Sequence, residues 1–370
     1  MPGLELDRRT LRLIAIAFTL LAALSIHRLF FADPPAAQQV LIIQGRTMGT
    51  TYEIRIAGDG LDESLRRRVE AETTHRLDQV DRWMSNWNPD SEIVRFNAHH
   101  ETSNFPVSVE TAEIVAFAIA LNETSAGAFD ISVGPLVARW GFGKDARIDS
   151  PPSTDEIEKL RSHIGAGVLR VGPQSGVGDA FLAKNDPLVE IDLSAIAKGY
   201  GVDHVAEGLA SLDRRDYLVE IGGEVRAGGE RPGGGPWRVA IEKPLDEGRG
   251  IQFVIELRDE AMATSGDYRI FYIEGEKRFS HTIDPRTGRP VEGGPASATV
   301  VAKTATEADA WATTLMVLGD DAGLELAQAQ GIAALLLVRD ENARIVTRRN
   351  ALFPEAIGER SESALGRTDR

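Results

Sequence analysis

The sequence feature that most restricts the fold is an unbroken succession of strand-like and helix-like segments over residues 40 to 355, with no linker long enough to divide it and no internal repeat. Runs such as Gln39–Ile43 and Thr51–Ile56 predict two strands of a hairpin, and apolar residues at helical spacing predict a long amphipathic helix over Leu61–Met84. Further strand-like runs between residues 217 and 301 favour antiparallel pairing. One α+β domain is therefore predicted.

Local signals place several more elements. Thr154–Ile164 predicts a short helix with Ser153 or Thr154 as its cap, and Leu188–Ile191 predicts a strand. Another helix is expected to start near Ser194, and Thr306–Leu318 predicts a helix towards the C-terminus. The region between residues 188 and 203 should therefore pass from a strand into a helix through a polar turn.

The N-terminus carries an export signal. Three arginines, Arg8, Arg9 and Arg12, precede the apolar run Leu13–Ile26, which Leu29–Phe31 extends. A basic flank before such a run is typical of a signal peptide, and the extended run is also compatible with an uncleaved signal-anchor. Both alternatives stay open for residues 1–33, and both direct the rest of the chain to the periplasmic side. The expected location is the inner (cytoplasmic) membrane, held through the N-terminal segment, with the catalytic domain facing the periplasm.

Composition excludes several classes of protein. The chain has no cysteine, so it can hold no disulfide framework, thiolate metal site, cysteine nucleophile or lipid anchor on cysteine. Its formal net charge of -15 argues against sequence-independent nucleic-acid binding, which requires clustered basic residues. Residues 356–370 are polar and predict a disordered tail.

Three motifs contain residues suited to catalysis or to ligand binding. His281 and Asp284 lie in a rigid Asp-Pro and Thr-Gly turn, where such pairs either cap the turn or catalyse proton transfer. Asp309 and Thr313 are one helical turn apart, so a carboxylate and a hydroxyl share one face, as a surface pair or as half of a site for Mg²⁺. Lys198 lies one turn inside an expected helix N-terminus, where it is either a solvated side chain or part of a phosphate site.

Together with other blocks, these motifs form an ordered series that resembles the FAD:protein FMN transferase family, also called ApbE-like. The resemblance covers roughly residues 44 to 320, and the conjunction of the blocks is far more specific than any one of them. The blocks are Met48-Gly49-Thr50, Met84 to Trp87 with Ser91-Glu92, Gly127 to Asp130, Asp192 to Asp203, Ile221 to Glu224, Thr264 to Tyr268, Ser280 to Pro290, and Ala308-Asp309 through Gly319.

The resemblance implies a fold and an activity. The fold would be a single bilobed, T-fold-related catalytic domain over residues 38–355, with mostly antiparallel sheets and flanking helices. The enzyme would cleave FAD with Mg²⁺, attach FMN by a phosphoester bond to a threonine of a partner protein, and release AMP. By analogy, the acceptor would be a flavoprotein subunit of a membrane electron-transfer complex.

The resemblance also implies site residues. The metal ligands would be Asp309, Thr313 and the backbone carbonyl of Ala195. His281 would manage the proton of the acceptor hydroxyl, with Asp284 orienting it or the metal. The positions that match FAD contacts of the family are Met48, Trp87, Ala128, Phe129, Asp130, Asp192, Lys198 and Ile283.

Some details of the site stay open at this point. Trp87 could stack on a flat ring or pack in the core. Lys198 lies where some relatives carry glutamate, so its contact would be electrostatic, with phosphate. Ala312 lies where some members offer an extra acid, which leaves more of the Mg²⁺ shell to water and phosphate.

Two alternatives share these motifs, namely an FAD pyrophosphatase, in which water attacks, and a flavin-binding module without turnover. A structural envelope protein would require the motif series to be a coincidence.

Overall fold

The computed structural model describes residues 39–143, 150–173, 179–245, 250–268, 271–274, 277–342 and 344–357. The predicted signal segment (residues 1–33) lies outside these residues, as does most of the predicted tail (358–370). From Val40 onward the chain forms one compact unit. Within the described residues, no helix combines the length and apolar character needed to cross a membrane.

The centre of this unit is an eight-stranded sheet in which every neighbouring pair is antiparallel. In spatial order the strands are β1 (Val40–Thr47), β2 (Thr50–Ala57), β6 (Tyr217–Ile221), β7 (Glu224–Gly228), β10 (Ala261–Gly266), β15 (Ser297–Ala302), β16 (Ala333–Arg339) and β17 (Ile345–Arg349).

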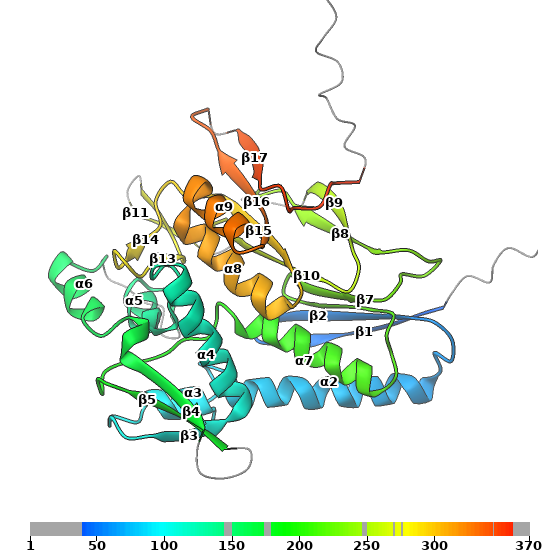
Figure 1. Cartoon of the computed structure of the whole chain (residues 1–370), viewed down its shortest axis with the longest axis horizontal. Coiled ribbons are helices and arrows are strands. Elements are labelled where there is room, and N and C mark those ends of the chain that lie inside the picture. Colours follow the sequence, from blue (N-terminus) through cyan, green and yellow to red (C-terminus); the bar gives the residue numbers. More distant parts are fainter. Residues whose placement is uncertain are drawn as a thin grey trace, which may run out of the picture. The chain divides into compact units, whose positions relative to one another are not determined.

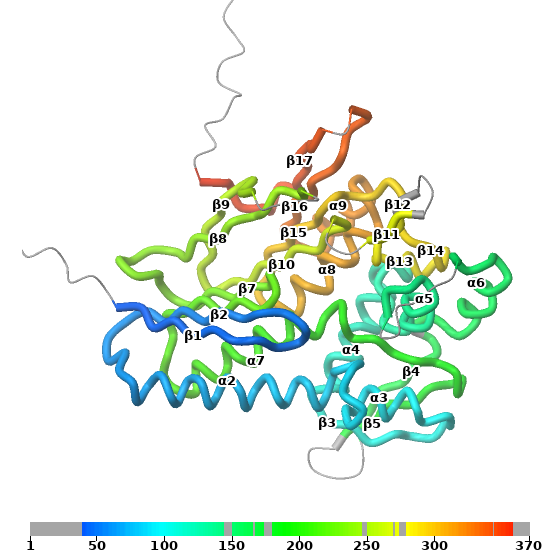
Figure 2. Tube along the Cα trace, turned by 180° about the vertical axis from the view of Figure 1, so that it is seen from behind, coloured from blue at the N-terminus to red at the C-terminus, as the bar shows by residue number. Residues whose placement is uncertain are grey.

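Helices cover one face of this sheet, and a separate hairpin packs on the other (Figure 1). In both views α2 and α7 run side by side along β1 and β2 (Figure 2). The helices of this layer are α2 (Glu63–Met84), α7 (Ala197–Ser211), α8 (Ala305–Leu318) and α9 (Asp320–Ala329), and the hairpin is β8 (Trp237–Glu242) with β9 (Ile251–Leu257).

Side chains of the central strands alternate between these two layers, as a sheet buried on both faces requires. In β10, Ala261 and Ala263 pack with the helices, whereas Met262 joins the cluster formed with the hairpin. In β16, Leu336 belongs to the helical side and Leu335 to the hairpin side. The continuous apolar run of β16 therefore reflects burial on both faces.

A smaller three-stranded sheet lies at one end of α2 (Figure 1). Its order is β3 (Phe105–Ser108), β5 (Asp179–Lys184) and β4 (Leu169–Pro173), accompanied by α3 (Glu92–Asn97), α4 (Val109–Thr124), η1 (Ile131–Val133), α5 (Gly134–Arg139), α6 (Thr154–Arg161) and η2 (Ala166–Val168). Phe96 and Leu182 of this part share one apolar cluster with Leu315 of α8, so a continuous core joins both sheets.

Two short antiparallel pairs complete the described elements: β11 (Phe271–Glu274) with β12 (Lys277–Ser280), and β13 (Ile283–Asp284) with β14 (Arg289–Pro290). The α+β class and the mostly antiparallel sheets predicted from the sequence are confirmed. The first hairpin turns at Met48 and Gly49, both at positive φ, and α6 begins with a capping box formed by Ser153 and Glu156.

One predicted strand is wrong. Leu188–Ile191 forms no strand; the strand in this region is β5, which ends at Lys184. The side chain of Asn97 bonds the backbone of Ile191 on both sides, donating from Nδ2 to its carbonyl (2.9 Å) and accepting from its amide at Oδ1 (2.8 Å). These bonds replace a strand neighbour. The following helix also starts later than expected, at Ala197.

Candidate functional site

A cavity of about 430 Å³ gathers most of the site residues predicted from the sequence. It opens among the β1–β2 and β6–β7 turns, β10, the start of α7, α8 and the loops around η1 and β13. Eleven of the thirteen predicted residues line it, namely Met48, Ala128, Phe129, Asp130, Asp192, Ala195, Lys198, His281, Ile283, Asp309 and Thr313. The structure therefore brings together segments that are far apart in the chain.

Met48 reaches the cavity from the two-residue turn of the first hairpin. Its side chain passes directly over Gly201 of α7, where an added Cβ would approach Met48 Cε to 2.9 Å. Glycine at this position of α7 therefore makes room for the methionine.

The Ala128-Phe129-Asp130 segment is held by bonds to its own backbone. Ser125 Oγ accepts from the Phe129 amide (3.0 Å), and Asn122 Nδ2 donates to the Phe129 carbonyl (2.7 Å). Asp130 Oδ1 accepts from the amide (2.8 Å) and hydroxyl (2.5 Å) of Ser132. Burial raises the pKa of Asp130, although the bonds from Ser132 oppose the shift. These bonds fix the segment where it lines the cavity.

Asp192 lies in the turn that leads into α7. Its Oδ1 accepts from the Ser194 amide (2.8 Å) and from Asn86 Nδ2, and Asn86 also donates to Ser194 Oγ (3.2 Å). The amide of Asp192 donates to the Ile131 carbonyl (2.7 Å). The carboxylate is thus oriented by Ser194 of its own turn and by Asn86, and the backbone bond to Ile131 holds the turn in place.

Oxygen atoms that could coordinate a metal lie near the start of α7 and on α8, in the wall of the same cavity. Asp309 is 2% exposed, and its Oδ2 accepts from the Gly199 amide (2.9 Å). In a regular helix that amide would bond to the carbonyl of Ala195, so this arrangement leaves the Ala195 carbonyl out of that bond. One turn along α8, Thr313 Oγ1 lies 3.3 Å from Ser265 Oγ. A carboxylate, a hydroxyl and a carbonyl are therefore available in one cavity.

Lys198 pairs with two carboxylates of this cavity. Its Nζ lies 2.8 Å from Glu224 Oε1 and 3.5 Å from Asp309 Oδ1. Burial alone would lower the pKa of Lys198, but the charges of Asp309 and Glu224 outweigh burial and raise it. Burial raises the pKa of Glu224 to about 7, against the opposing effect of Lys198, and burial likewise raises the pKa of Asp309. The lysine expected at a phosphate is here the counter-ion of two acids.

His281 and Asp284 are placed differently with respect to the cavity. His281 lines it, and its ring meets Phe142 edge-on at 6.4 Å between centroids. Asp284 is absent from the lining and forms a bidentate pair with Arg286, with both contacts at 2.9 Å. These bonds between Asp284 and Arg286 hold the turn together.

Trp87 is the other predicted residue outside the lining. It is 60% exposed and follows α2, next to Asn86, whose side chain reaches the cavity residues Asp192 and Ser194. The core-packing alternative for Trp87 is thus wrong. Its predicted contact with FAD stays a prediction.

Sequence reasoning assigned no role to Glu224, Thr50 or Ser265, although all three line the cavity. Each lies in a block that was part of the family resemblance, which was the available signal. Glu224 follows the Gly222-Gly223 turn between β6 and β7, where both glycines have positive φ. Only the pairing of these strands beside α7 brings Glu224 to Lys198.

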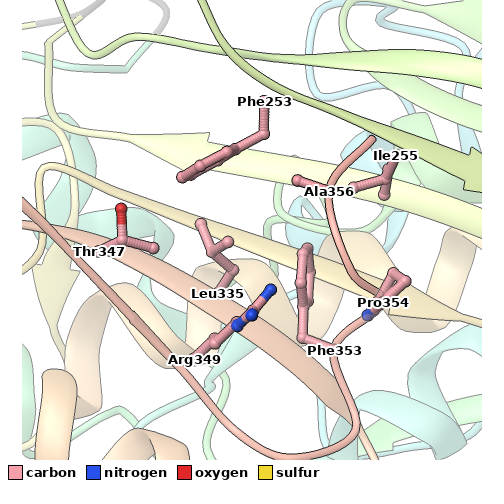
Figure 3. A pocket seen from close by; sticks show the side chains of 8 residues that line it. All are labelled: Phe253, Ile255, Leu335, Thr347, Arg349, Phe353, Pro354 and Ala356. Atoms are coloured by element: carbon pink, nitrogen blue, oxygen red, sulfur yellow. The ribbon is translucent and has the colours of Figure 1, made fainter. Parts of the chain in front are cut away.

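A second, smaller cavity of about 230 Å³ lies between β9 of the β8–β9 hairpin and strands β16 and β17 of the central sheet. Figure 3 shows the side chains that line it, which are Phe253, Ile255, Leu335, Thr347, Arg349, Phe353, Pro354 and Ala356. Its described lining offers no carboxylate or imidazole, so the larger cavity is the candidate active site.

Comparison with known proteins places this chain in one family. A sequence model of the ApbE family matches residues 48–336. The FAD:protein FMN transferase of Vibrio cholerae is 42% identical over 324 residues, which cover 87% of this chain and 94% of that protein. The enzyme of the same name from Haemophilus influenzae is 40% identical over 317 residues, covering 85% and 91%. The solved structure of the flavin transferase ApbE from Vibrio cholerae matches with a TM-score of 0.76 at 40% identity, covering 85% of this chain and 98% of that one.

Proposed function

Because the chain belongs to the ApbE family, whose similar members are named FAD:protein FMN transferases, we propose that the larger cavity cleaves FAD and passes its FMN to a protein acceptor. The chain is accordingly an enzyme, a flavin transferase. The observation that carries the assignment of the reaction to this cavity is the meeting of His281, Asp309 and Thr313 in its wall, because one group can accept a proton and two can hold a cation.

The donor set fits Mg²⁺, which prefers oxygen ligands and keeps part of its water shell. Asp309, Thr313 and the carbonyl of Ala195 would hold it, and Glu224 adds a carboxylate oxygen that is buried without a hydrogen-bond partner among the described residues. Within the described residues no group of three or more acidic or histidine side chains is spaced to chelate a metal, so water and phosphate would complete the shell. When bound, the metal would neutralise the pyrophosphate charge.

The protein's own groups would do the rest by positioning and proton transfer. His281 accepts the proton of a threonine hydroxyl, whose oxygen attacks the phosphorus on the FMN side. The phosphorus–oxygen bond to AMP breaks, AMP leaves with the bridging oxygen, and a phosphoester joins FMN to the acceptor. Asp130 and Asp192 are fixed before substrate arrives, so they orient FAD without rearranging.

We further propose that the catalytic domain works on the outer side of the cytoplasmic membrane, on a subunit of a membrane electron-transfer complex. The basic residues and apolar run at the N-terminus support this location. Cell fractionation with a protease-accessibility assay tests it, and a protein found only in the cytoplasm would refute it.

The direct test of the reaction combines the full-length protein, FAD, MgCl₂ and a threonine-bearing acceptor domain. Intact-protein mass spectrometry should show an acceptor heavier by one FMN, with AMP released in equal amount and no product after chelation. A threonine-to-valine acceptor is the control. Metal-dependent release of FMN and AMP with an unmodified acceptor would favour the pyrophosphatase, and bound but intact FAD would favour a binding module.

A further inference from the structure

Glu224 is a buried acid in the candidate active site, and its contact with Lys198 has so far been given no role. It is 3% exposed, and it lines the cavity from the end of the β6–β7 turn. Its Oε1 accepts from Lys198 Nζ at 2.8 Å, whereas its Oε2 has no hydrogen-bond partner among the described residues. Because an unsatisfied buried carboxylate oxygen costs free energy, this atom points to a ligand that the site is built to receive.

Lys198 lies between this acid and the expected metal ligand Asp309. Oδ2 of Asp309 is occupied by the Gly199 amide, and Oδ1 is 3.5 Å from the Lys198 ammonium. The ammonium therefore contacts the same carboxylate oxygen that a divalent cation would use. Lys198 is still 31% exposed at its side chain, so it can turn towards the cavity without unfolding α7.

Building on the proposed function, we propose that Glu224 is a positioning residue that holds Lys198 as a built-in cation between the two carboxylates. The divalent cation then has to displace the ammonium from Asp309. The metal and the Lys198–Asp309 contact therefore exclude one another, and the released ammonium is free to meet the substrate's phosphate while Glu224 keeps it within reach.

This arrangement makes a prediction of opposite sign for two variants. In Lys198→Met the competing positive charge is gone, so a divalent cation should bind more tightly, by about tenfold for a unit charge a few ångströms from the ion. In Glu224→Gln the site loses a negative charge and the ammonium keeps Asp309 as its remaining carboxylate, so the cation should bind more weakly. A loss of fold stability would weaken binding in both variants.

The experiment titrates Mn²⁺ into the full-length protein without FAD and measures the free ion by electron paramagnetic resonance. A second titration adds Mg²⁺ as a competitor. Lys159→Met and Glu325→Gln are matched controls, because these exposed residues of α6 and α9 lie outside the cavity and change the net charge equally. The double variant Lys198→Met with Glu224→Gln should bind more tightly than Glu224→Gln alone. Circular dichroism verifies that each variant is folded.

Tighter Mn²⁺ binding by Lys198→Met, with the Lys159 control unchanged, supports the inference. Unchanged or weaker binding, or no binding by either the wild type or Lys198→Met, overturns it. The transfer assay separates the two levels of the proposal. FMN transfer without the Lys198 effect rejects only the built-in cation, whereas the effect without any FMN transfer rejects only the proposed reaction.

Discussion

Gly199→Ala would test how closely the two helices of the site must approach. An added Cβ at Gly199 of α7 would lie 2.2 Å from the carbonyl oxygen of Ala305 and 2.8 Å from Cβ of Asp309, both on α8. Ordinary contacts start near 3.4 Å, so α7 and α8 would have to separate by about 1 Å, against close packing. The same movement would lengthen the bond from the Gly199 amide to Asp309 Oδ2, which is 2.9 Å.

Two opposing effects determine how far Gly199→Ala changes the free energy of unfolding. Helix propensity favours alanine over glycine by about 1 kcal/mol. Overpacking costs about 1–3 kcal/mol, and the upper end applies because the obstructing atom belongs to the backbone of α8. We therefore expect Gly199→Ala to lower the free energy of unfolding by about 2 kcal/mol and to weaken Mn²⁺ binding as well.

Urea unfolding followed by circular dichroism measures this loss. Gly208→Ala in the same helix is the control, because an added Cβ there would meet Glu72 Cγ at 3.0 Å and Arg76 Cγ at 3.3 Å, in side chains that can turn away. The free energy of unfolding of Gly208→Ala should therefore be unchanged or higher than that of the wild type by up to about 1 kcal/mol. A Gly199→Ala protein as stable as the Gly208→Ala protein would refute the packing argument.

Further outcomes are expected at three other residues. His281→Ala should slow FMN transfer by about a hundredfold while leaving the Kd for FAD near that of the wild type, and transfer at full rate would assign the proton to another group. Thr313→Val should raise the Kd for Mn²⁺ by about tenfold in the resonance assay, and an unchanged Kd would remove the hydroxyl from the metal site. Lys184→Met should lower the free energy of unfolding in urea by about 3 kcal/mol, because the buried ammonium donates to three backbone carbonyls. Burial lowers the pKa of Lys184 below 10.5, so the unfolded chain keeps the proton of this lysine to higher pH than the folded chain does. The free energy of unfolding of the wild type should therefore rise relative to that of Lys184→Met as the pH rises towards 10.5. A difference in free energy that does not change with pH would contradict this.

Elements defined by nearby residues could be predicted from the sequence. The hairpin at Met48-Gly49, the cap of α6 at Ser153, and the apolar periodicity of α2 each depend on neighbours within a few turns of chain. Leu188–Ile191 failed because its backbone bonds to the side chain of Asn97, more than ninety residues away. No local pattern carries that information.

The same division holds for the site. The sequence by itself determined the α+β class and the family, and it supplied a set of candidate site residues, because these depend on local periodicity and on motifs in a fixed order. Only the tertiary structure decided that Asp284 bonds with Arg286 in its own turn, that Trp87 is exposed outside the cavity lining, and that Glu224 and Lys198 form an ion pair. These outcomes depend on burial and on charges brought together by strand pairing and helix packing, which act between residues that are distant along the chain.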